Sequence, residues 1–289
     1  MPKKGNAKSL SSGRPPNAIK PKASLSSQAT RTLIRTHHQL NKQLGAAKAK
    51  CDHAEASQIQ KRIDDLGGLK SYQQASIQGQ SNDRGGDSST VLMAWLHHLD
   101  KALSDMRPKL RLLEVGALST RNACSRSGLF DVQRIDLNSQ AEGILQQDFM
   151  QRPLPKSHAE KFDIISLSLV VNYVPDAARR GEMLRRTCQF LDTAHQDSGT
   201  SEMKVNFPAL FLVLPAPCIT NSRYMDEARL KSIMQSLGYT LLQRKQTAKL
   251  VYYLWHMSQP AASSAMHFPK EEVNPGVTRN NFSIVLDKV

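Results

Sequence analysis

The chain has 289 residues, a formal net charge of +14 at pH 7 and a sequence pI of about 9.8. This length accommodates one sizeable domain with extensions, and the excess of positive charge favours a polyanionic partner, with nucleic acid ahead of an anionic membrane surface. The four cysteines form no Cys-x-x-Cys pair, which argues against a disulfide framework or a zinc site and for a reducing compartment. Because no apolar run is long enough to cross a bilayer and the first residues do not form a signal peptide, we expect an intracellular, soluble protein.

The first 86 residues precede the main domain. Residues 1–29 contain six Lys or Arg and no Asp or Glu, and this composition predicts a disordered basic tail. We interpret the tail as a phosphate-binding or nuclear-import arm, against the alternative of a merely solvated segment. Residues 30–86 are predicted to form a helical extension, because apolar residues recur at helical spacing on either side of a break after Gly45. A short helix is also expected over 69–75. The basic helix faces could follow an RNA backbone or simply face solvent.

The main domain is predicted over 87–259, and it opens with a helix capped by the Ser-Ser-Thr run at 88–90. Five apolar runs then follow, bounded by turn residues, as is typical of strands buried on both faces of a parallel sheet. Their sequences are LRLLEV, VQRID, IL, FDIISLSL and ALFLVL. Two alternating segments, 239–246 and 250–257, are predicted to close the sheet as an antiparallel pair. The fold class is therefore α/β, a Rossmann-like sheet with helices on both faces, followed by a C-terminal wrap over 260–289 in which 284–286 form an edge strand.

Ligands of such sheets bind beyond the carboxyl ends of the strands. The residues at those ends are Glu114, Gly116, Asp136, Asp148 and the turn from Ser168 to Asn172. A glycine after the first strand lets the backbone approach a ligand closely, and an acid about 20 residues further on accepts the ribose hydroxyls of a nucleotide. The pattern predicts a nucleotide site at this edge. The link at 121–128 between the first two strands is shorter than an ordinary crossover.

Two nucleotide ligands compete for this site, a dinucleotide and S-adenosylmethionine. A dinucleotide needs several glycines so that its pyrophosphate can rest on a helix N-terminus, but the turn after the first strand has only Gly116. Glu114 would repel a pyrophosphate and attract a cationic methionine moiety. S-adenosylmethionine is therefore favoured.

Asp148 and Phe149 follow the third strand. An acid and an aromatic ring suit an adenine, with the carboxylate accepting the exocyclic amine and the ring stacking on the base. The alternative is that Asp148 caps backbone amides at the start of a loop. The helix that begins near Asp176 carries four arginines, interpreted either as phosphate contacts or as a solvated face: Arg179, Arg180, Arg185 and Arg186. The adjacent pairs at 37–38 and 97–98 are the only neighbouring histidines, and adjacent helical side chains diverge, so no metal site is expected.

Six motifs resemble the fungal 25S ribosomal RNA adenine-N1 methyltransferase family between about Leu66 and Trp255. They are YQQAS, RGGDSS, LLEVGALS, RIDLNS, QQDFMQRPLP and FDIISLSLVVNYVP. The resemblance implies a class I methyltransferase sheet, S-adenosylmethionine as donor, adenine N1 as acceptor and an address in the nucleus and nucleolus. It places Gly116 and Asp136 at the family's cofactor positions, and it supports a cofactor-covering role for the segment with Tyr72, Gln73, Arg84 and Asp87. Leu118 and Thr120 stand where methyltransferases usually have glycines, so the methionine end must be held differently.

Neutral adenine N1 carries an in-plane lone pair, so the expected catalysis is mainly orientation of an unpaired or flipped base. We expect Asn172 and Tyr173 to shape the acceptor pocket, and the Ser168 hydroxyl or its neighbouring backbone to contact the Watson–Crick edge. No catalytic acid, base or nucleophile is indicated.

The expected partner is ribosomal RNA or a pre-60S particle. No membrane or metal partner is expected, and the protein is expected to be monomeric. The rival hypothesis is a binding module that senses S-adenosylmethionine and acts through a protein partner. An NAD-dependent dehydrogenase is disfavoured, because the chain lacks both the glycine fingerprint and a Tyr-x-x-x-Lys or His/Asp pair.

Overall fold

A computed structural model describes residues 27–68, 71, 86–139, 141–193, 207–258 and 267–288. Most of the predicted basic tail lies outside these residues. So do the predicted short helix over 69–75, apart from Ser71, and the side chains of Tyr72, Gln73 and Arg84.

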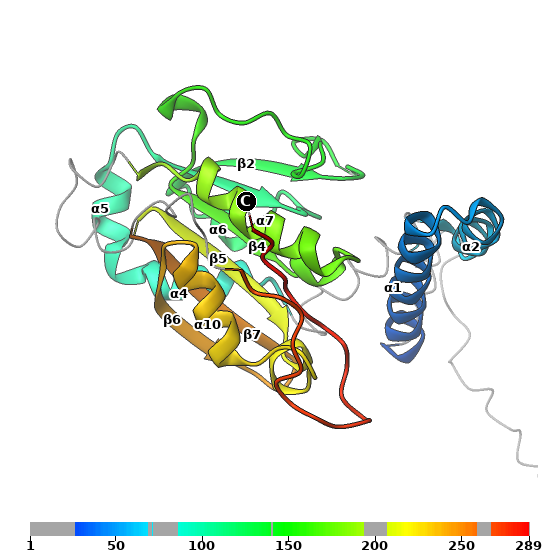
Figure 1. The fold of residues 1–289 in the computed structure, drawn as a ribbon. Coiled ribbons are helices and arrows are strands. Elements are labelled where there is room, and N and C mark those ends of the chain that lie inside the picture. Colours follow the sequence, from blue (N-terminus) through cyan, green and yellow to red (C-terminus); the bar gives the residue numbers. More distant parts are fainter. Residues whose placement is uncertain are drawn as a thin grey trace, which may run out of the picture.

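A seven-stranded sheet forms the centre of the molecule (Figure 1), and its strand order is β3-β2-β1-β4-β5-β7-β6. The strands are β1 (Leu110–Val115), β2 (Phe130–Asp136), β3 (Leu145–Gln146), β4 (Ile164–Ser168), β5 (Ala209–Pro215), β6 (Tyr239–Gln246) and β7 (Leu250–Met257). The first five are parallel, and β7 pairs antiparallel with both β5 and β6. The α/β fold and the closing antiparallel pair are thereby confirmed. Because the first five strands share one direction, their carboxyl ends meet at one edge of the sheet.

Helices cover both faces of the sheet. One face packs against α4 (Ser89–Leu96), η1 (His97–Leu99) and α5 (Asp100–Asp105), where Leu92 and Leu96 meet Leu112 and Phe211. The other face packs against α7 (Ala177–Phe190) and α10 (Glu227–Ser236), where Leu184 and other apolar residues are fully buried. Apolar residues alternate between the two faces along β1, so the strand is buried on both sides.

The connections on the β2–β3 side of the sheet are short. The link from β1 to β2 contains only α6 (Ala123–Arg126), which confirms the short crossover. The described part of the link from β2 to β3 contains no helix, and the link from β3 to β4 contains only η2 (His158–Glu160). The remaining short helices, η3 (Val171–Tyr173) and α9 (Pro217–Thr220), follow the carboxyl ends of β4 and β5. No helix in the described ranges has the length and apolar character needed to cross a membrane.

Two N-terminal helices stand beside the sheet (Figure 1) and have a small core of their own. They are α1 (Ser27–Ala49) and α2 (His53–Asp65). The predicted helical extension is confirmed as two helices, although α1 continues for four residues beyond Gly45 and the chain reverses at Cys51, whose φ is +56°. Asp52 then caps α2 by accepting from the amide of Glu55 at 2.9 Å. A Cβ added at Gly45 would lie 3.9 Å from Cβ of Pro175, so this part of α1 lies beside the loop after β4.

The predicted edge strand at 284–286 is also wrong. This segment does not join the sheet, and it packs instead along α7, where the amide of Val285 donates to the carbonyl of Ala177 at 3.0 Å. A Cβ added at Gly181 would lie 1.8 Å from the carbonyl oxygen of Val285, so only glycine allows this approach. We call residues 282–287 the C-terminal strap.

Candidate functional site

The turn after β1 is built around Gly116. Its φ is +73°, and its amide donates to the carbonyl of Ile135 in β2 at 2.8 Å. A Cβ at this position would lie 2.8 Å from Cγ2 of Val170, which belongs to the turn after β4. Glycine therefore lets the turns that follow β1 and β4 meet at the carboxyl edge of the sheet.

A small polar hollow opens at this edge. It is lined by Asp87, Ser88, Glu114, Val115, Gly116, Leu118, Asn122 and Ser168. The structure therefore brings together three of the predicted site residues, Glu114, Gly116 and Ser168. Asp87, expected only to cover the cofactor, also lines the hollow. Sequence reasoning missed Asn122 as a site residue, because it lies in a polar turn whose path depends on the unusually short crossover.

Glu114 contributes a largely buried carboxyl group to the hollow. Its Oε1 accepts a hydrogen bond from Nδ2 of Asn122, and its Oε2 is buried with no partner among the described residues. Burial raises the pKa of Glu114 from 4.5 to about 7, while the nearby Arg134 lowers this pKa and the nearby Asp87 raises it. A buried carboxylate oxygen without a partner is costly. A cationic or hydrogen-bond-donating ligand in the hollow would supply the missing partner.

Asp87 lines the hollow just before α4 and connects the start of α4 to α6. Its Oδ1 accepts from the amide of Ser89 at 2.9 Å and from the Ser89 hydroxyl at 2.8 Å. Its Oδ2 accepts from the amide of Ala123 in α6. The neighbouring Ser88 hydroxyl lies 2.7 Å from the Ser168 hydroxyl at the end of β4. The predicted contact of Ser168 with a base would thus require its hydroxyl to exchange partners, or its backbone to make the contact.

The acids after β2 and β3 lie at the same edge but do not line the hollow. Oδ1 of Asp136 accepts from the amide of Asn138 at 2.8 Å, and Oδ1 of Asp148 accepts from the amide of Met150 at 2.8 Å. Each carboxylate therefore supports the turn that follows it.

The ring of Phe149 lies in the core rather than at the edge of the sheet. It is 2% exposed, and its centre lies 5.3 Å from the centre of the Phe190 ring. This packing contradicts the predicted stacking of the Phe149 ring on an adenine. The physical reason is that the side chain fills the space between the sheet and α7.

The turn after β4 contains Asn172 and Tyr173 within η3. It begins with Leu169, a non-glycine residue at φ +58°, whose amide donates to the carbonyl of Val213 in β5 at 3.0 Å. Such a backbone conformation costs about 1–3 kcal/mol and persists only where the surroundings enforce it. Oδ1 of Asn172 is buried and has no hydrogen-bond partner in the described part of the chain. Neither Asn172 nor Tyr173 lines the hollow, so the structure does not bring them together with Glu114, Gly116 and Ser168 there.

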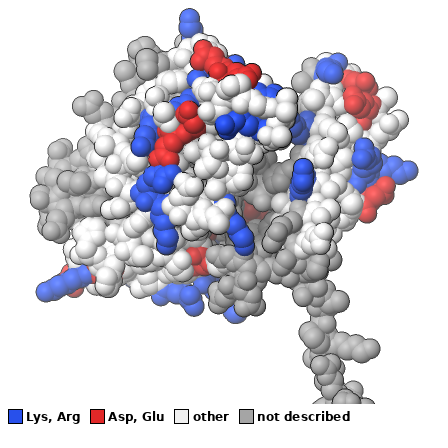
Figure 2. Space-filling view, turned by 90° about the horizontal axis from the view of Figure 1, so that it is seen from below, with Lys and Arg blue, Asp and Glu red and all other residues white. Residues whose placement is uncertain are grey.

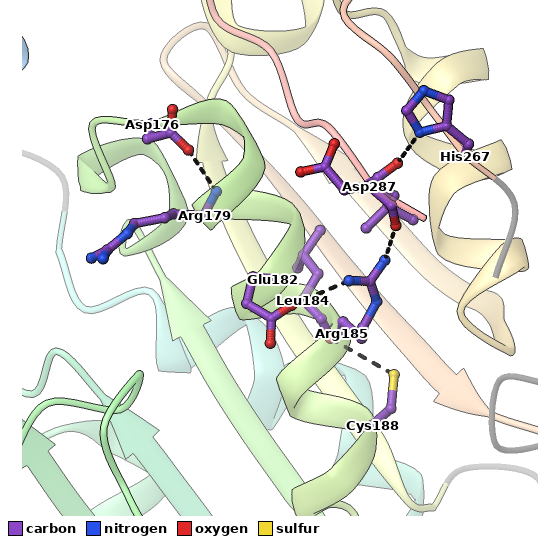
Figure 3. Close-up of polar contacts among 9 residues, drawn as sticks. Asp176, Arg179, Glu182, Leu184, Arg185, Cys188, His267 and Asp287 are labelled. Carbon is purple, nitrogen blue, oxygen red and sulfur yellow. Dashed lines mark hydrogen bonds and ion pairs between the residues drawn. The ribbon is translucent and has the colours of Figure 1, made fainter. Parts of the chain in front are cut away.

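The four arginines of α7 do not form a common phosphate-binding face. Arg180, Arg185 and Arg186 donate to backbone carbonyls elsewhere in the protein, with Arg185 reaching the carbonyl of Asp287 at 2.7 Å (Figure 3). Arg179 is exposed, and its guanidinium points away from the surrounding chain in Figure 3. Both sequence interpretations are therefore wrong for Arg180, which is buried, and for Arg186, which donates to the carbonyls of Phe149 and Arg152. Arg185 stays partly exposed and also pairs with Glu182.

The titratable side chains in the described ranges form no group of three that could hold a metal ion. Of the adjacent histidines, His97 lies 2.7 Å from a carboxylate oxygen of Asp100, and Nδ1 of His98 lies 3.0 Å from the carbonyl of Trp95. Figure 2 shows Lys and Arg in several separate patches, with Asp and Glu between them, over the face it presents.

Three solved structures show a distant similarity to this chain. A putative methyltransferase from Bacillus halodurans C-125 is 13% identical, with a TM-score of 0.32 over 51% of this chain and 70% of that chain. A putative methyltransferase in complex with the Trm112 activator of Haloferax volcanii is 9% identical, with a TM-score of 0.34 over 63% of this chain and 96% of that chain. The 16S rRNA methylase RmtB is 13% identical, with a TM-score of 0.34 over 78% of this chain and 74% of that chain.

Sequence relatives are much more similar. Residues 57–284 match the family described as "25S rRNA (adenine(2142)-N(1))-methyltransferase, Bmt2". The Saccharomyces cerevisiae protein "25S rRNA (adenine(2142)-N(1))-methyltransferase" is 38% identical over 229 residues, which are 79% of this chain but only 63%, less than two thirds, of that protein. The Schizosaccharomyces pombe protein "25S rRNA adenine-N(1) methyltransferase" is 37% identical over 255 residues, which are 87% of this chain and 89% of that protein. This chain therefore belongs to the family of 25S rRNA adenine-N(1) methyltransferases described as Bmt2.

Proposed function

We propose that this chain transfers the methyl group of S-adenosylmethionine to N1 of an adenine in 25S rRNA. The observation that carries this proposal is the family match over residues 57–284, together with two relatives whose names state methylation of an adenine N1 in 25S rRNA. The site supports it, because a polar hollow with an excess of acid lies at the carboxyl edge of the sheet, where nucleotide ligands of such folds bind.

The residues of the edge fit S-adenosylmethionine. Asp136 would accept the ribose hydroxyls, since it is the acid that ends β2 and its Oδ1 already holds the following turn through the amide of Asn138. Glu114 would face the cationic methionine end, because its buried Oε2 lacks a partner in the described residues. Gly116 would let the backbone approach the ligand closely. Leu118 and Asn122 line the hollow near the usual glycine positions, so side chains would hold the methionine end there.

The protein's part in the reaction is orientation. When bound, S-adenosylmethionine supplies a methyl group that its sulfonium makes reactive toward a nucleophile. Asn172 and Tyr173 would shape the pocket that places adenine N1 in line with that methyl group, and the backbone near Ser168 would contact the base edge. Because the product base is cationic, Glu114 or Asp148 would offset its charge. The target adenine must be unpaired or flipped out of its helix to enter the pocket.

The test is a reconstituted reaction. Purified protein, labelled S-adenosylmethionine and 25S rRNA should yield 1-methyladenosine, identified by mass analysis of the digested nucleosides. The same RNA carrying an adenine-to-guanine change at the site corresponding to that of the S. cerevisiae relative should not be labelled there. Binding of S-adenosylmethionine without any RNA methylation would contradict the enzyme and favour the rival sensing module.

We further infer that the protein acts in the nucleolus, as a monomer, on ribosomal RNA or a pre-60S particle. The basic composition supports an RNA partner. Imaging of a fluorescent fusion and sedimentation of the purified protein test the location and the monomeric state. Co-sedimentation of the fusion with pre-60S particles, compared with binding to deproteinised rRNA, tests which substrate form is used.

A further inference from the structure

Arg180 is a buried charge with no ion-pair partner among the described residues. The residue is 8% exposed, and its guanidinium donates to three backbone carbonyls. Nε reaches the carbonyl of Val174 at 2.8 Å, Nη2 that of Pro175 at 3.1 Å and Nη1 that of Ser283 at 2.7 Å. The guanidinium carbon also lies 4.7 Å from the centre of the Phe282 ring.

These three carbonyls belong to two separate segments. Val174 and Pro175 directly follow Asn172 and Tyr173, the residues proposed to shape the acceptor pocket. Ser283 lies in the C-terminal strap, 103 positions further along the chain from Arg180. A planar guanidinium presents five N–H donors in a fixed fork, so it can fix the relative positions of several acceptors, which a lysine ammonium cannot do equally well.

The strap is itself held firmly against α7. The amide of Val285 donates to the carbonyl of Ala177, the absence of a Cβ at Gly181 lets the carbonyl of Val285 approach, and Arg185 donates to the carbonyl of Asp287. On its other side the strap pairs with Phe268, and Nδ1 of His267 lies 3.0 Å from the carbonyl of Leu286 (Figure 3). The strap therefore gives Arg180 a fixed support.

The loop on the other side of Arg180 has little regular structure to hold it. It consists of one turn of η3, preceded by Leu169 at positive φ. Two backbone hydrogen bonds lie within it: the amide of Tyr173 donates to the carbonyl of Val170 at 2.9 Å, and the amide of Val174 donates to the carbonyl of Val171 at 3.3 Å. Val171 anchors the start of this element in the core, whereas Asn172, Tyr173 and Val174 are only partly buried and Pro175 is exposed. In-line methyl transfer is sensitive to misplacement of the base by about 1 Å.

We infer that Arg180 is a positioning residue, which together with Phe282 and Ser283 of the C-terminal strap clamps the loop at 172–175 in the geometry that presents adenine N1 to the methyl donor. This inference rests on the proposed function. Arg180 does not touch the base or the cofactor, and it acts through the carbonyls of Val174 and Pro175.

The experiment compares Arg180→Lys and Arg180→Met with Arg229→Met. Arg229 is a suitable control because it also connects a helix to the C-terminal segment: it donates to the carbonyl of Pro269 and pairs with Glu271. It makes no hydrogen bond to the loop at 172–175. Phe282→Leu and Phe282→Tyr form a second pair, in which only tyrosine keeps the ring beneath the guanidinium. For each variant the readouts are kcat, the Kd for S-adenosylmethionine, the Tm, and hydrogen exchange at the amides of Tyr173 and Val174.

We expect Arg180→Met to lower kcat by about tenfold or more, with the Kd for S-adenosylmethionine changed less than about twofold and faster exchange at the two loop amides. Arg180→Lys should be intermediate, and Phe282→Tyr should restore the kcat that Phe282→Leu loses. Arg229→Met should lower the Tm but keep kcat and loop exchange.

Wild-type kcat in a folded Arg180 or Phe282→Leu variant would overturn the inference. An equal loss of kcat in Arg229→Met at an equal loss of Tm would do so as well, because it would show a general loss of stability. If the wild-type protein does not methylate RNA, the proposed function fails instead. The exchange rates then still decide whether Arg180 clamps the loop, since they do not depend on activity.

Discussion

At Glu114, burial and charge together link cofactor binding to pH. The pKa of about 7 means that the carboxyl is largely neutral below that pH and ionised above it. A cationic ligand requires the ionised form, so its affinity should fall with acidification. The effect on the fold has the opposite sign. Because the pKa in the folded chain lies above the unfolded value of 4.5, the folded state holds this proton more tightly, and the contribution of Glu114 to stability falls as pH rises from 4.5 to 7.

We therefore predict that the Kd of the wild-type protein for S-adenosylmethionine rises as pH falls from about 8 to 6, approaching a tenfold rise per pH unit at the acid end. Glu114→Gln should bind more weakly than wild type at pH 8 and show a much flatter dependence. Titration calorimetry at several pH values measures both. An identical pH dependence in the two proteins would show that Glu114 does not face the cation.

Alanine substitutions at Gly116 and Gly128 would distinguish the cost of backbone strain from the effect of a steric clash. Both have positive φ, +73° and +69°, but a Cβ at Gly116 would meet Val170 while a Cβ at Gly128 would have no neighbour within 4 Å. Each change to alanine should cost about 1–2 kcal/mol for the left-handed conformation. Gly116→Ala should in addition displace the turn after β4 and weaken cofactor binding, whereas Gly128→Ala should not. Equal Kd values in the two variants would show that the turn after β1 does not form the cofactor site.

Asp136 is predicted to bind the ribose through the charge of its carboxylate. Asp136→Ala should weaken S-adenosylmethionine binding by about tenfold or more and leave the fold intact, because two charge-assisted hydrogen bonds to the ribose would be removed. Asp136→Asn keeps an oxygen for the amide of Asn138 but removes the charge, so it should preserve the turn and still bind weakly. Calorimetry on both variants measures this, and an unchanged affinity in Asp136→Ala would exclude the assignment.

At the scale of elements, the strands were predictable and several partners of the helices were not. An apolar run such as FDIISL is buried on both faces wherever its neighbours lie, so composition alone indicates a central strand, and the ends of such strands located Glu114, Gly116 and Ser168. By contrast, Arg180 binds a carbonyl 103 positions away, and Gly181 meets Val285. No local pattern encodes such contacts, which is why the arginines of α7 and the C-terminal strap were misinterpreted.

Asp87, at the start of α4, is predicted to contribute both to the stability of the fold and to cofactor binding. Asp87 accepts two hydrogen bonds from Ser89 at the beginning of α4 and one from the amide of Ala123 in α6, so Asp87→Ala should cost about 1–3 kcal/mol in the free energy of unfolding. It should also weaken cofactor binding, because Asp87 and Ser88 line the hollow. Asp226→Ala is the matched control, since Asp226 caps α10 through the amide of Arg229 at 2.8 Å and does not line the hollow. Urea denaturation and calorimetry should show a loss of stability in both variants and a loss of affinity only in Asp87→Ala.

At the scale of the whole molecule, the site and the positive charge are distributed differently. The hollow is acidic, and the sheet domain shows mixed patches of both signs in the view of Figure 2. The pair α1–α2 lies beside the loop after β4, with Gly45 close to Pro175, and it carries exposed Arg35, Lys42 and Lys48. Because Arg180 and Arg186 donate to carbonyls within the protein and Arg185 pairs with Glu182, we expect RNA affinity to come largely from other residues.

Residues 1–29 are the strongest remaining candidate for RNA binding, because they contain six Lys or Arg and no Asp or Glu. If this segment grips phosphates, its removal should weaken binding to 25S rRNA and flatten the salt dependence, by about 0.7 to 0.9 in the log–log slope for each phosphate that the chain no longer neutralises. Replacing the six basic residues with serine in the full chain is the matched control and should reproduce the truncation. Affinity for S-adenosylmethionine should stay the same in both, since the described residues that line the hollow lie between Asp87 and Ser168. Filter binding across a series of salt concentrations measures the slopes. An unaltered slope would assign the tail to nuclear import or to no binding role, and RNA would then have to dock through α1, α2 and Arg179.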